Sequence, residues 1–481
     1  MPPASPIQTL VAIPLCVDLD GTLIRTDMLW ESLVRLLKKN PLAIFAVLRW
    51  LMRGRAHLKQ QLARRVTVDA TILPYHEPLL AWLREQKKAG RKLVLATASD
   101  LRMAQPVADH VGLFDEVMAS DGQINLRQAN KRRALAAKFG ERGFDYAGNS
   151  NDDLGVWSGA HAAIVVNASR SLAVRAEKLT LVTVTFLREE SKLWAIFRSL
   201  RPHQWVKNLI IFVPLLAGHK LGELALLGRA GLACLAFCFC ASAIYIANDL
   251  MDLDADRRHA SKCLRPFASG ELTISTGLLL ASLLLAVGLL FSAALSNEFL
   301  GITTCYLLLA TIYSWWLKRV IWLDVVLLAG LYTVRLIAGG VATGVIDSFW
   351  LLLFSMFLFL SLALVKRYVE LDDTKIAIVG ANGRGYGQRD LKLIQIFGTI
   401  CGALAALVLV LYVNSHAVVI LYAHPARLLV LGPLLLFWIS RVWFLARRGK
   451  VHDDPVVFAL KDTVSYLIGG VMLFMLWLAT D

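Results

Sequence analysis

The stretch "NDLMDLDADRRHASKCLRPFASGEL", residues 248–272, lies between two almost wholly apolar segments, residues 231–247 and 276–295. Each flanking segment has roughly the length that crosses a bilayer, about 20 residues. The stretch opens with acidic residues and continues with basic ones: Asn248, Asp249, Asp252, Asp254 and Asp256, then Arg257, Arg258, Lys262 and Arg265. Charged side chains beside lipid are costly unless they have partners, and they commonly mark functional sites. A charged ligand is therefore expected at the mouth of a membrane domain.

The second half of the chain repeats this apolar pattern. Hydrophobic residues make up 57% of the 481 residues, above the roughly 45–50% of soluble domains. Before about residue 190 the composition is that of an ordinary soluble domain. Nine later runs of near-spanning length predict an all-α membrane domain of nine helices: residues 205–218, 226–247, 273–295, 300–317, 321–343, 349–365, 394–413, 428–445 and 458–479.

Basic residues in the connections predict the topology. Within the second half of the chain, most Lys and Arg lie in the connections after the second, fourth, sixth and eighth runs. Lys375 and Arg384, after the sixth run, are among them. Cytoplasmic loops carry such an excess, so the N-terminus and the even-numbered loops are expected in the cytosol of a bacterium, beneath the inner membrane. The opening "MPPASPIQTL" shows no secretory signal pattern, which agrees. Because basic residues cluster between the apolar runs, we interpret the net charge of +15 through this topology rule and expect no nucleic-acid partner.

The spacing of the acidic residues indicates a metal site. On a helix, Asn248, Asp252 and Asp256 stand at i, i+4 and i+8, and Asp249 shares their face. Like charges this close repel one another unless a cation neutralises them, and oxygen ligands suit Mg²⁺, which also binds phosphate oxygens. We therefore expect these four residues to bind Mg²⁺. Asp254 lies off this face and is expected to be solvated. The alternative is a solvated acidic loop between two spans.

Further polar side chains are expected on the same side of the membrane. The candidates for binding substrate phosphates are Lys207, Asn208, Arg258, Lys262, Arg265, Tyr313, Lys318, Lys366 and Arg367. Basic groups beside an Asp-rich helix suit phosphate recognition, although any single Lys or Arg here is also the ordinary topology signal. Arg335, inside the fifth run, either lines a cavity or extends outward to the interface.

The first half alternates predicted strands with helical stretches. Segments 11–17, 92–99, 144–148 and 161–169 are predicted strands. Asp18 and Asp20 follow the first of these strands, Thr97 lies near the end of the second, and Asp153 follows the third. Lys131 opens a predicted helix. In a doubly wound α/β fold the site lies beyond the carboxyl ends of the strands. The sequence therefore predicts this fold, with these side chains at its site.

The order "DLDGT", Thr97, Lys131, "GNSNDD" resembles the four motifs of the haloacid dehalogenase-like hydrolases. The resemblance implies that Asp18 attacks phosphorus and that Asp20 is the general acid and base. It also implies that Thr97 and Lys131 hold the phosphoryl oxygens. Asp18 and Asp153 would bind Mg²⁺, which offsets the negative charge of the substrate.

Asn149 departs from the pattern of that family, which usually has an aspartate directly after the glycine of its fourth motif. An amide can coordinate Mg²⁺ but brings no charge. Two interpretations therefore stay open: an active phosphatase, or a degenerate domain with a regulatory or folding role.

The predicted organisation has three parts. Residues 1–187 form the hydrolase-like domain, with a small helical cap at 28–66. Residues 188–200 form an amphipathic linker, and residues 201–481 form the membrane domain. Within the cap, residues 41–51, "PLAIFAVLRWL", are unusually apolar and form either a buried helix or a face that rests on the bilayer.

The stretch "NDLMDLDAD" matches NDxxDxxxD, the first aspartate-rich motif of the UbiA superfamily of intramembrane prenyltransferases. Nine spans also fit that family. "RPHQWVKN", "YSWWLKRVIWLD" and "KRYVEL" resemble its decaprenyl-phosphate phosphoribosyltransferase branch more closely. Aromatic prenyltransferases of the superfamily carry a second aspartate motif after the sixth span, where this chain has Lys366 and Arg367.

The resemblance implies that Mg²⁺ held by the motif, with Asp249 and Asp252 as catalytic residues, binds phosphoribosyl diphosphate. A polyprenyl phosphate would accept the 5-phosphoribosyl group, and each domain would have one Mg²⁺ site. The soluble domain would then remove the 5-phosphate from the product, or act on an unrelated phosphate ester. The alternatives are prenyl transfer to an aromatic or other acceptor, and a non-catalytic scaffold or transporter.

Overall fold

The computed structural model describes the chain except residues 1–12, 121–124, 188–190, 346–347, 374–384, 416–417, 419–421, 452–453 and 481. Its contacts divide it into two compact units: Met1–Leu200 with Ile246–Leu280, and Arg201–Tyr245 with Ala281–Asp481. The aspartate-rich stretch therefore belongs to the first unit. Parts of three predictions lie outside the described residues: the start of the strand at 11–17, the start of the linker at 188–200, and the basic residues Lys375 and Arg384.

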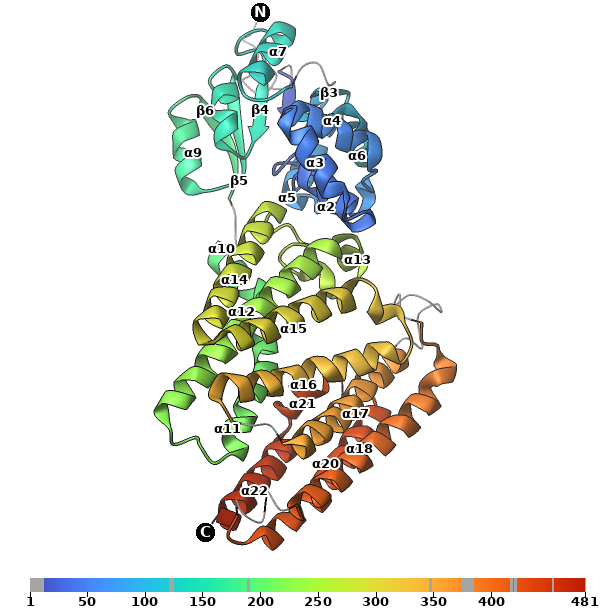
Figure 1. Ribbon diagram of the computed structural model, residues 1–481. Helices are drawn as coiled ribbons and strands as arrows, with labels where there is room; N and C mark the ends of the chain where they lie inside the picture. Colours follow the sequence, from blue (N-terminus) through green and yellow to red (C-terminus); the bar gives the residue numbers. More distant parts are fainter. Residues whose placement is uncertain are drawn as a thin grey trace, which may run out of the picture. The chain divides into compact units, whose positions relative to one another are not determined.

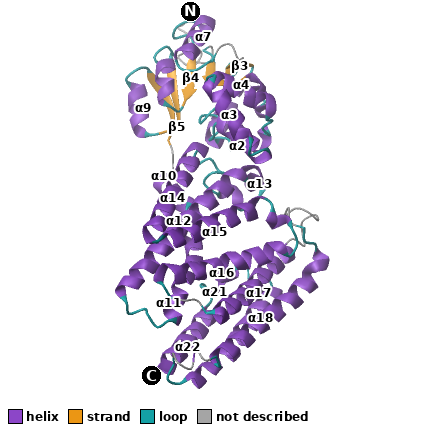
Figure 2. Ribbon diagram, in the orientation of Figure 1, coloured by secondary structure: helices purple, strands orange, loops and turns teal. Residues whose placement is uncertain are grey.

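A parallel sheet forms the centre of the first unit (Figure 2). The strand order is β3-β2-β1-β4-β5-β6. The strands are β1 (Leu15–Val17), β2 (Leu93–Asp100), β3 (Glu116–Ser120), β4 (Asp145–Gly148), β5 (Ala162–Ala168) and β6 (Leu181–Leu187). The order reverses between β1 and β4, which is the switch point of a doubly wound fold. The predicted α/β fold class is confirmed.

Helices cover both faces of this sheet: α5 (Glu77–Lys88), α6 (Leu101–Val111), α7 (Ala129–Phe139) and α9 (Arg170–Glu177). Because successive strand residues point to opposite faces, Leu15 and Val17 share a core with α5 and α6. Cys16 shares the other core with α7 and α9. Strands buried on both faces are continuous apolar runs, which is why they are visible in the sequence.

Three helices form the cap: α2 (Met28–Lys39), α3 (Ala43–Met52) and α4 (Arg55–Arg65). The side chain of Asp27 caps α2 by accepting from the first N–H groups of the helix. Helix α3 buries only Val47 and Trp50. Most apolar side chains in and beside it are exposed: Leu42, Ile44, Phe45, Leu48, Leu51 and Met52. This exposure fits the bilayer-facing alternative better than a buried cap helix.

The aspartate-rich stretch is not one helix. Helix α12 (Leu224–Met251) ends before Asp252, whose backbone has φ −102° and ψ 15°, and α13 (Leu253–Arg258) begins after it. The helix predicted from residue 248 to 256 is therefore interrupted at Asp252, although Asp252 N–H still donates to the Asn248 carbonyl at 2.9 Å and Asp256 N–H to the Asp252 carbonyl at 2.8 Å. Asp252 directly precedes α13, but its side chain makes no capping hydrogen bond to that helix. The 3₁₀ helix η4 (Lys262–Leu264) and α14 (Ile274–Leu295) follow.

Seven of the described helices are long and apolar enough to cross a membrane. They are α12, α14, α16 (Leu323–Thr343), α17 (Phe349–Asp373), α18 (Leu391–Val413), α20 (Leu431–Arg447) and α22 (Thr463–Thr480). The first predicted run is instead the 3₁₀ helix η3 (Pro202–Phe212) and the short α11 (Val213–Ala217), and the fourth is α15 (Asn297–Trp315). A multi-pass helical domain is therefore confirmed, whereas nine spans are not.

Helices α16, α17, α18 and α20 pack against one another in chain order in the second unit (Figure 1). Two glycines of α18 let α20 approach closely. A Cβ atom on Gly398 would lie 2.0 Å from the Trp443 ring, and one on Gly402 would lie 2.5 Å from Ile439. Small residues commonly permit such close contact between membrane helices.

Candidate active sites

The carboxyl ends of β1 and β4 bring predicted hydrolase residues together. Asp18 follows β1, and Lys131 Nζ donates to its Oδ1 at 2.7 Å. Lys131 also donates to Tyr146 Oη at 2.8 Å, and Tyr146 donates to Asp153 Oδ1 at 3.0 Å. Asp18 and Asp153 are therefore linked through Lys131 and Tyr146. Sequence reasoning missed Tyr146, whose one signal is its place near the end of the predicted strand "FDYAG".

Asp20 is held by two other elements. Ser99 Oγ, from β2, donates to Asp20 Oδ2 at 2.6 Å, and the backbone N–H of Met28, at the start of α2, donates to Oδ1 at 2.8 Å. Thr97 is fully buried in β2, and its Oγ1 accepts from the N–H of Ser99 at 3.0 Å. The predicted acid–base residue is thus fixed in position by the sheet and the cap.

In the fourth motif, Asp153 is the aspartate joined to Asp18 through Tyr146 and Lys131. Its Oδ2 accepts from the backbone N–H of Asn149 at 3.0 Å. The Asn149 side chain lies against the first motif, since a Cβ atom on Gly21 would lie 2.1 Å from Asn149 Nδ2. Asp152 instead pairs with Arg127 at 2.7 Å. Asn149 therefore packs against the loop that carries Asp18 and Asp20.

The charges of this site favour a cation. Burial raises the pKa of Asp18 to about 7, although the Lys131 charge opposes this, and the Asp153 charge adds to it. Burial, followed by the charge of Asp27, raises the pKa of Asp20 to about 6. Several carboxylates thus share one ammonium group, and oxygen donors with excess negative charge fit Mg²⁺. Among the described residues, no group of three or more His, Cys, Asp or Glu is placed to hold a metal.

Arg265 bridges two aspartates of the membrane-domain motif. Its Nη1 donates to Asp256 Oδ2 at 2.7 Å and to Asp249 Oδ1 at 3.2 Å. Both carboxylates are buried, and burial raises the pKa of Asp256 although Arg265 opposes this. Two buried carboxylates that face one cation also fit a divalent metal ion. Arg265, predicted to contact substrate phosphate, is bound to these aspartates in this structure.

Asp252 of the motif and Asp254, which lies outside it, pair with the cap helix α2. Lys38 Nζ lies 3.2 Å from Asp252 Oδ1. Arg35 donates to both oxygens of Asp254, at 3.1 Å and 2.5 Å. The prediction that Asp254 is merely solvated is therefore wrong. A sequence pattern shows which residues share a helical face, but it does not show which other segment of the chain lies opposite.

Three further predicted ligand residues also lie in the first unit. Arg258 Nη2 donates to Asp69 Oδ2 at 2.9 Å and its side chain is 61% exposed. Lys262 begins η4, and Asn248 lies in the last turn of α12. Arg258 and Arg265 are therefore both paired with carboxylates.

In the second unit, Asp454 joins two predicted phosphate-binding lysines. Its Oδ2 accepts from Lys207 at 2.7 Å and from Lys366 at 3.0 Å, and Tyr332 Oη donates to Oδ1 at 3.4 Å. Burial would raise the pKa of Asp454, but the two ammonium charges hold it well below its ordinary value. Sequence reasoning missed Asp454. The available signal was an acidic "HDDP" in an otherwise basic connection.

A second polar cluster surrounds Arg367. Its Nε donates to Asp324 Oδ2 at 2.5 Å and its Nη2 to Tyr313 Oη at 3.0 Å, and Glu370 pairs with Nη1. Tyr386 donates to the other oxygen of Asp324 at 2.5 Å. Arg367 and Asp324 are both fully buried. The structure therefore places the predicted Tyr313 and Arg367 in contact.

Arg335 lies inside the helix bundle and does not extend to the surface. It is buried, with Nε donating to Asn208 Oδ1 at 2.8 Å and Nη2 to Tyr306 Oη at 2.9 Å. Asn208 in turn donates to Cys238 Sγ at 3.2 Å. Lys318 lies in the 3₁₀ helix η5 (Leu317–Arg319) and is half-buried.

Comparisons with known proteins agree with both resemblances. Residues 15–156 match the haloacid dehalogenase-like hydrolase family. An uncharacterised Sinorhizobium fredii protein, y4nM, is 36% identical over 96% of this chain and 90% of its own length. Decaprenyl-phosphate phosphoribosyltransferase of Corynebacterium glutamicum is 37% identical over 180 residues, 37% of this chain and 54% of that relative. This chain thus spans about half of that transferase.

A UbiA homolog from Archaeoglobus fulgidus, solved bound to GPP and Mg²⁺, aligns with a TM-score of 0.43 and 18% identity over 60% of this chain and 99% of that one. Residues 209–478, more than half of the chain, match the UbiA prenyltransferase family. They include the aspartate-rich stretch and the clusters around Asp454 and Arg367. This chain belongs to the UbiA prenyltransferase family and carries a haloacid dehalogenase-like domain at its N-terminus.

Proposed function

We propose that the membrane domain transfers a 5-phosphoribosyl group from phosphoribosyl diphosphate to a polyprenyl phosphate. The observation that carries this proposal is the basic pair Lys366 and Arg367 in α17. It stands where aromatic prenyltransferases of the superfamily carry a second aspartate motif. Lys366, whose side chain is 28% exposed, suits a sugar phosphate or a lipid phosphate, whereas Arg367, the next residue in the sequence, is buried against Asp324. The similarity to a decaprenyl-phosphate phosphoribosyltransferase supports the same reaction.

In this reaction, Asn248, Asp249, Asp252 and Asp256 would hold Mg²⁺, which would offset the charge of the diphosphate. An oxygen of the polyprenyl phosphate attacks ribose C1. The bond from C1 to the diphosphate oxygen breaks, and its electron pair leaves with diphosphate. Arginine and lysine side chains such as Arg265 stabilise the negative charge of the leaving group.

The soluble domain, in this proposal, removes the 5-phosphate from the lipid product. Asp18 attacks phosphorus and forms an aspartyl phosphate, while Asp20 gives a proton to the leaving ribose oxygen. Asp20 then takes a proton from the water that releases phosphate. Lys131 holds a phosphoryl oxygen. The predicted topology supports this role, since it puts the domain on the side where the product head group emerges.

A cavity in the first unit shares Asn167 with the loop of Asp18 and Asp20, although the predicted catalytic residues do not line it. Its volume is about 410 Å³, and its lining includes Arg25, His76, Asn167, Lys192 and Glu271. Asn167 Nδ2 donates to the carbonyl of Gly21, in the loop that also carries the two catalytic aspartates, at 3.4 Å. Basic and amide side chains here suit a phosphorylated sugar.

The transferase proposal is tested with the purified full-length protein in detergent and Mg²⁺. One reaction receives labelled phosphoribosyl diphosphate and polyprenyl phosphate, and the other receives labelled prenyl diphosphate and an aromatic acid. Labelled lipid in the first reaction only is the expected result. Labelled product in the second only would establish the prenyl-transfer alternative. Turnover in neither would favour a non-catalytic role.

The phosphatase proposal is tested by comparing the lipid products of the wild type and Asp18→Asn. Accumulation of the 5-phosphorylated lipid in the variant only is expected. Identical products that both retain the 5-phosphate would show that the domain does not act on this lipid. An unrelated phosphate ester would then be the remaining class of substrate.

A further inference from the structure

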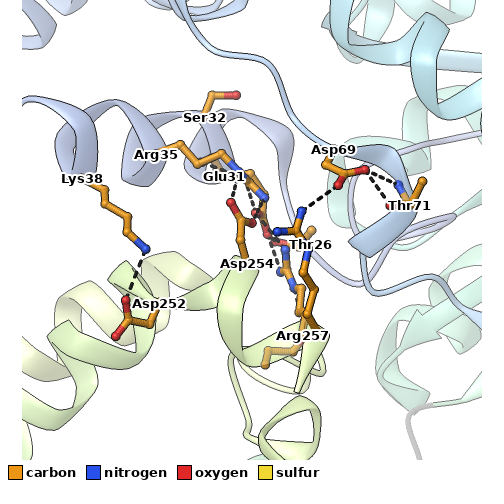
Figure 3. Close-up of polar contacts among 12 residues, drawn as sticks. Thr26, Glu31, Ser32, Arg35, Lys38, Asp69, Thr71, Asp252, Asp254 and Arg257 are labelled. Atoms are coloured by element: carbon orange, nitrogen blue, oxygen red, sulfur yellow. Dashed lines mark hydrogen bonds and ion pairs between the residues drawn. The ribbon is translucent and has the colours of Figure 1, made fainter. Parts of the chain in front are cut away.

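Within the first unit, the cap helix α2 faces the aspartate-rich helix α13 through a buried ion pair (Figure 3). Arg257 donates to the two oxygens of Glu31 at 2.7 Å and 3.1 Å. The Glu31 side chain is 0% exposed and the Arg257 side chain 4%. Thr26 Oγ1 also donates to Glu31, at 2.6 Å. An intact buried pair with extra hydrogen bonds holds its two segments firmly, because removing either partner leaves a buried charge.

Arg35 extends the contact by one turn of α2. It pairs with Glu31 at 2.6 Å on its own helix and donates to both oxygens of Asp254 on α13. Bidentate contacts between arginine and carboxylate fix the relative orientation of the two side chains as well as their distance. Glu31, Arg35, Asp254 and Arg257, which we name the α2–α13 clamp, thus join the cap to the motif at two adjacent points.

Lys38 lies one further turn along α2, with its ammonium group 3.2 Å from Asp252. Its side chain is 44% exposed and that of Asp252 is 39% exposed. A pair this exposed contributes little to stability, so the contact has no evident structural purpose. It does place a soluble-domain cation at an aspartate assigned to the metal and the diphosphate.

The opposite end of α2 belongs to the hydrolase site. The helix starts at its cap, Asp27, and the backbone N–H of Met28 holds Asp20 at 2.8 Å. One helix of 12 residues therefore contacts the predicted general acid of the hydrolase at its start and Asp252 of the transferase motif near its end.

We propose that α2 is a shared part of both sites. The clamp positions α13, and Lys38 contacts the diphosphate group bound at the aspartate-rich motif. Glu31 and Arg35 are positioning residues, whereas Lys38 is a substrate-binding residue supplied by the soluble domain. The role of Lys38 rests on the proposed function, because it requires a diphosphate at Asp252. The positioning role of the clamp does not depend on the proposed function, because it rests only on the contacts between α2 and α13.

The clamp is tested by hydrogen exchange on the full-length protein. In Glu31→Gln, amides of Leu253–Arg258 are expected to exchange at least tenfold faster than in the wild type. Glu141→Gln, at an exposed pair with Arg132 in the same unit, is the matched control and leaves them unchanged. If Glu31→Gln does not fold, Asp254→Asn removes half of the clamp without leaving a buried charge. Unchanged exchange in α13 in the folded variant would overturn the clamp.

Lys38 is tested by titrating inorganic diphosphate into the full-length protein in Mg²⁺. Lys38→Met is expected to weaken binding about tenfold, and Lys38→Arg to restore it. Lys39→Met, at the neighbouring exposed lysine of the same helix, leaves binding unchanged. Equal affinity in Lys38→Met and the wild type would overturn this role.

The two binding and exchange experiments and the transferase assay test different claims, so a negative result in one can be told apart from a negative result in another. Wild-type protein that binds diphosphate but transfers no phosphoribosyl group would refute the proposed function and leave the clamp and Lys38 standing. Wild-type transfer with Lys38→Met unaffected in both KM and kcat would refute the role of Lys38 alone. A raised KM for phosphoribosyl diphosphate with kcat retained would support it.

Discussion

Asp454→Asn should destabilise the membrane domain strongly, because Asp454 is the shared counter-ion of two lysines. Its carboxylate is 8% exposed, Lys207 is 9% exposed and Lys366 is 28% exposed. Asparagine has nearly the same shape but no charge, so the substitution leaves two ammonium groups without their anion. The hydrogen bond from Tyr332 can still be made to an amide oxygen.

The size of the effect follows from burial. Removing one partner of a buried ion pair costs about 3–5 kcal/mol. Lys366 keeps some contact with solvent, which favours the lower end, about 3 kcal/mol. At 1.36 kcal/mol per tenfold change, the folding equilibrium falls roughly 10²-fold. Asp454→Glu, which keeps the charge, is the control and should recover most of this loss.

The pH dependence gives a second, sharper test. The pKa of Asp454 is lowered in the folded protein, so its contribution is complete above its ordinary pKa of about 4. The contribution is lost as pH falls through the lowered value, because protonated aspartate carries no charge. Denaturant unfolding in detergent should therefore show wild type and Asp454→Asn far apart at pH 7 and converging below about pH 4. A difference under 1 kcal/mol at pH 7, or one that does not change with pH, would refute this reasoning.

Three further results are expected. Lys131→Met removes a charge that lowers the pKa of Asp18, so the acid limb of residual phosphatase activity towards an aryl phosphate should move to higher pH; an unmoved profile would contradict the role of Lys131. Asp249→Ala and Asp252→Ala should each abolish lipid transfer in a folded protein, and full activity in either would remove that residue from the metal site. An impermeant maleimide on intact cells should fail to label Cys263, since its loop is predicted to be cytosolic; rapid labelling would invert the topology.

Local sequence patterns predicted four of the six strands of the α/β domain and missed β3 and β6, which are less buried than the others. Its strands are short apolar runs ended by polar residues, and parallel strands place those residues at one edge. Asp18, Lys131 and Asp153 could therefore be assigned together before any distance was known. Tyr146 escaped because a tyrosine in a strand is ordinary, and its bonds to Lys131 and Asp153 are visible only in three dimensions.

The metal chemistry predicted for the aspartate-rich stretch stays a prediction, and its predicted geometry holds only in part. Helical spacing suggested one face, but the helix breaks at Asp252. Asp249 and Asp256 nevertheless meet, through Arg265. Spacing therefore identified two aspartates that share one arginine, although the helix between them is interrupted at Asp252.

The partners of the basic residues could not be predicted, because they come from distant segments. Arg257 and Glu31 are 226 residues apart, and Lys207 and Asp454 are 247 apart. A count of lysines and arginines between apolar runs treats each one as a topology signal. The count does not distinguish Lys207, which is buried in an ion pair, from an exposed loop lysine.

The carboxylate partners of these cations also constrain how the transferase site can bind its ligands. Arg265 is predicted to contact diphosphate, yet its Nη1 is engaged by Asp249 and Asp256. Those same carboxylates are the predicted Mg²⁺ ligands, so a metal ion and Arg265 compete for them. Binding of Mg²⁺ would release the guanidinium to pair with an anion, and a bound anion would in turn draw Arg265 away from the aspartates. Because such coupling is reciprocal, Mg²⁺ and diphosphate should each strengthen the binding of the other.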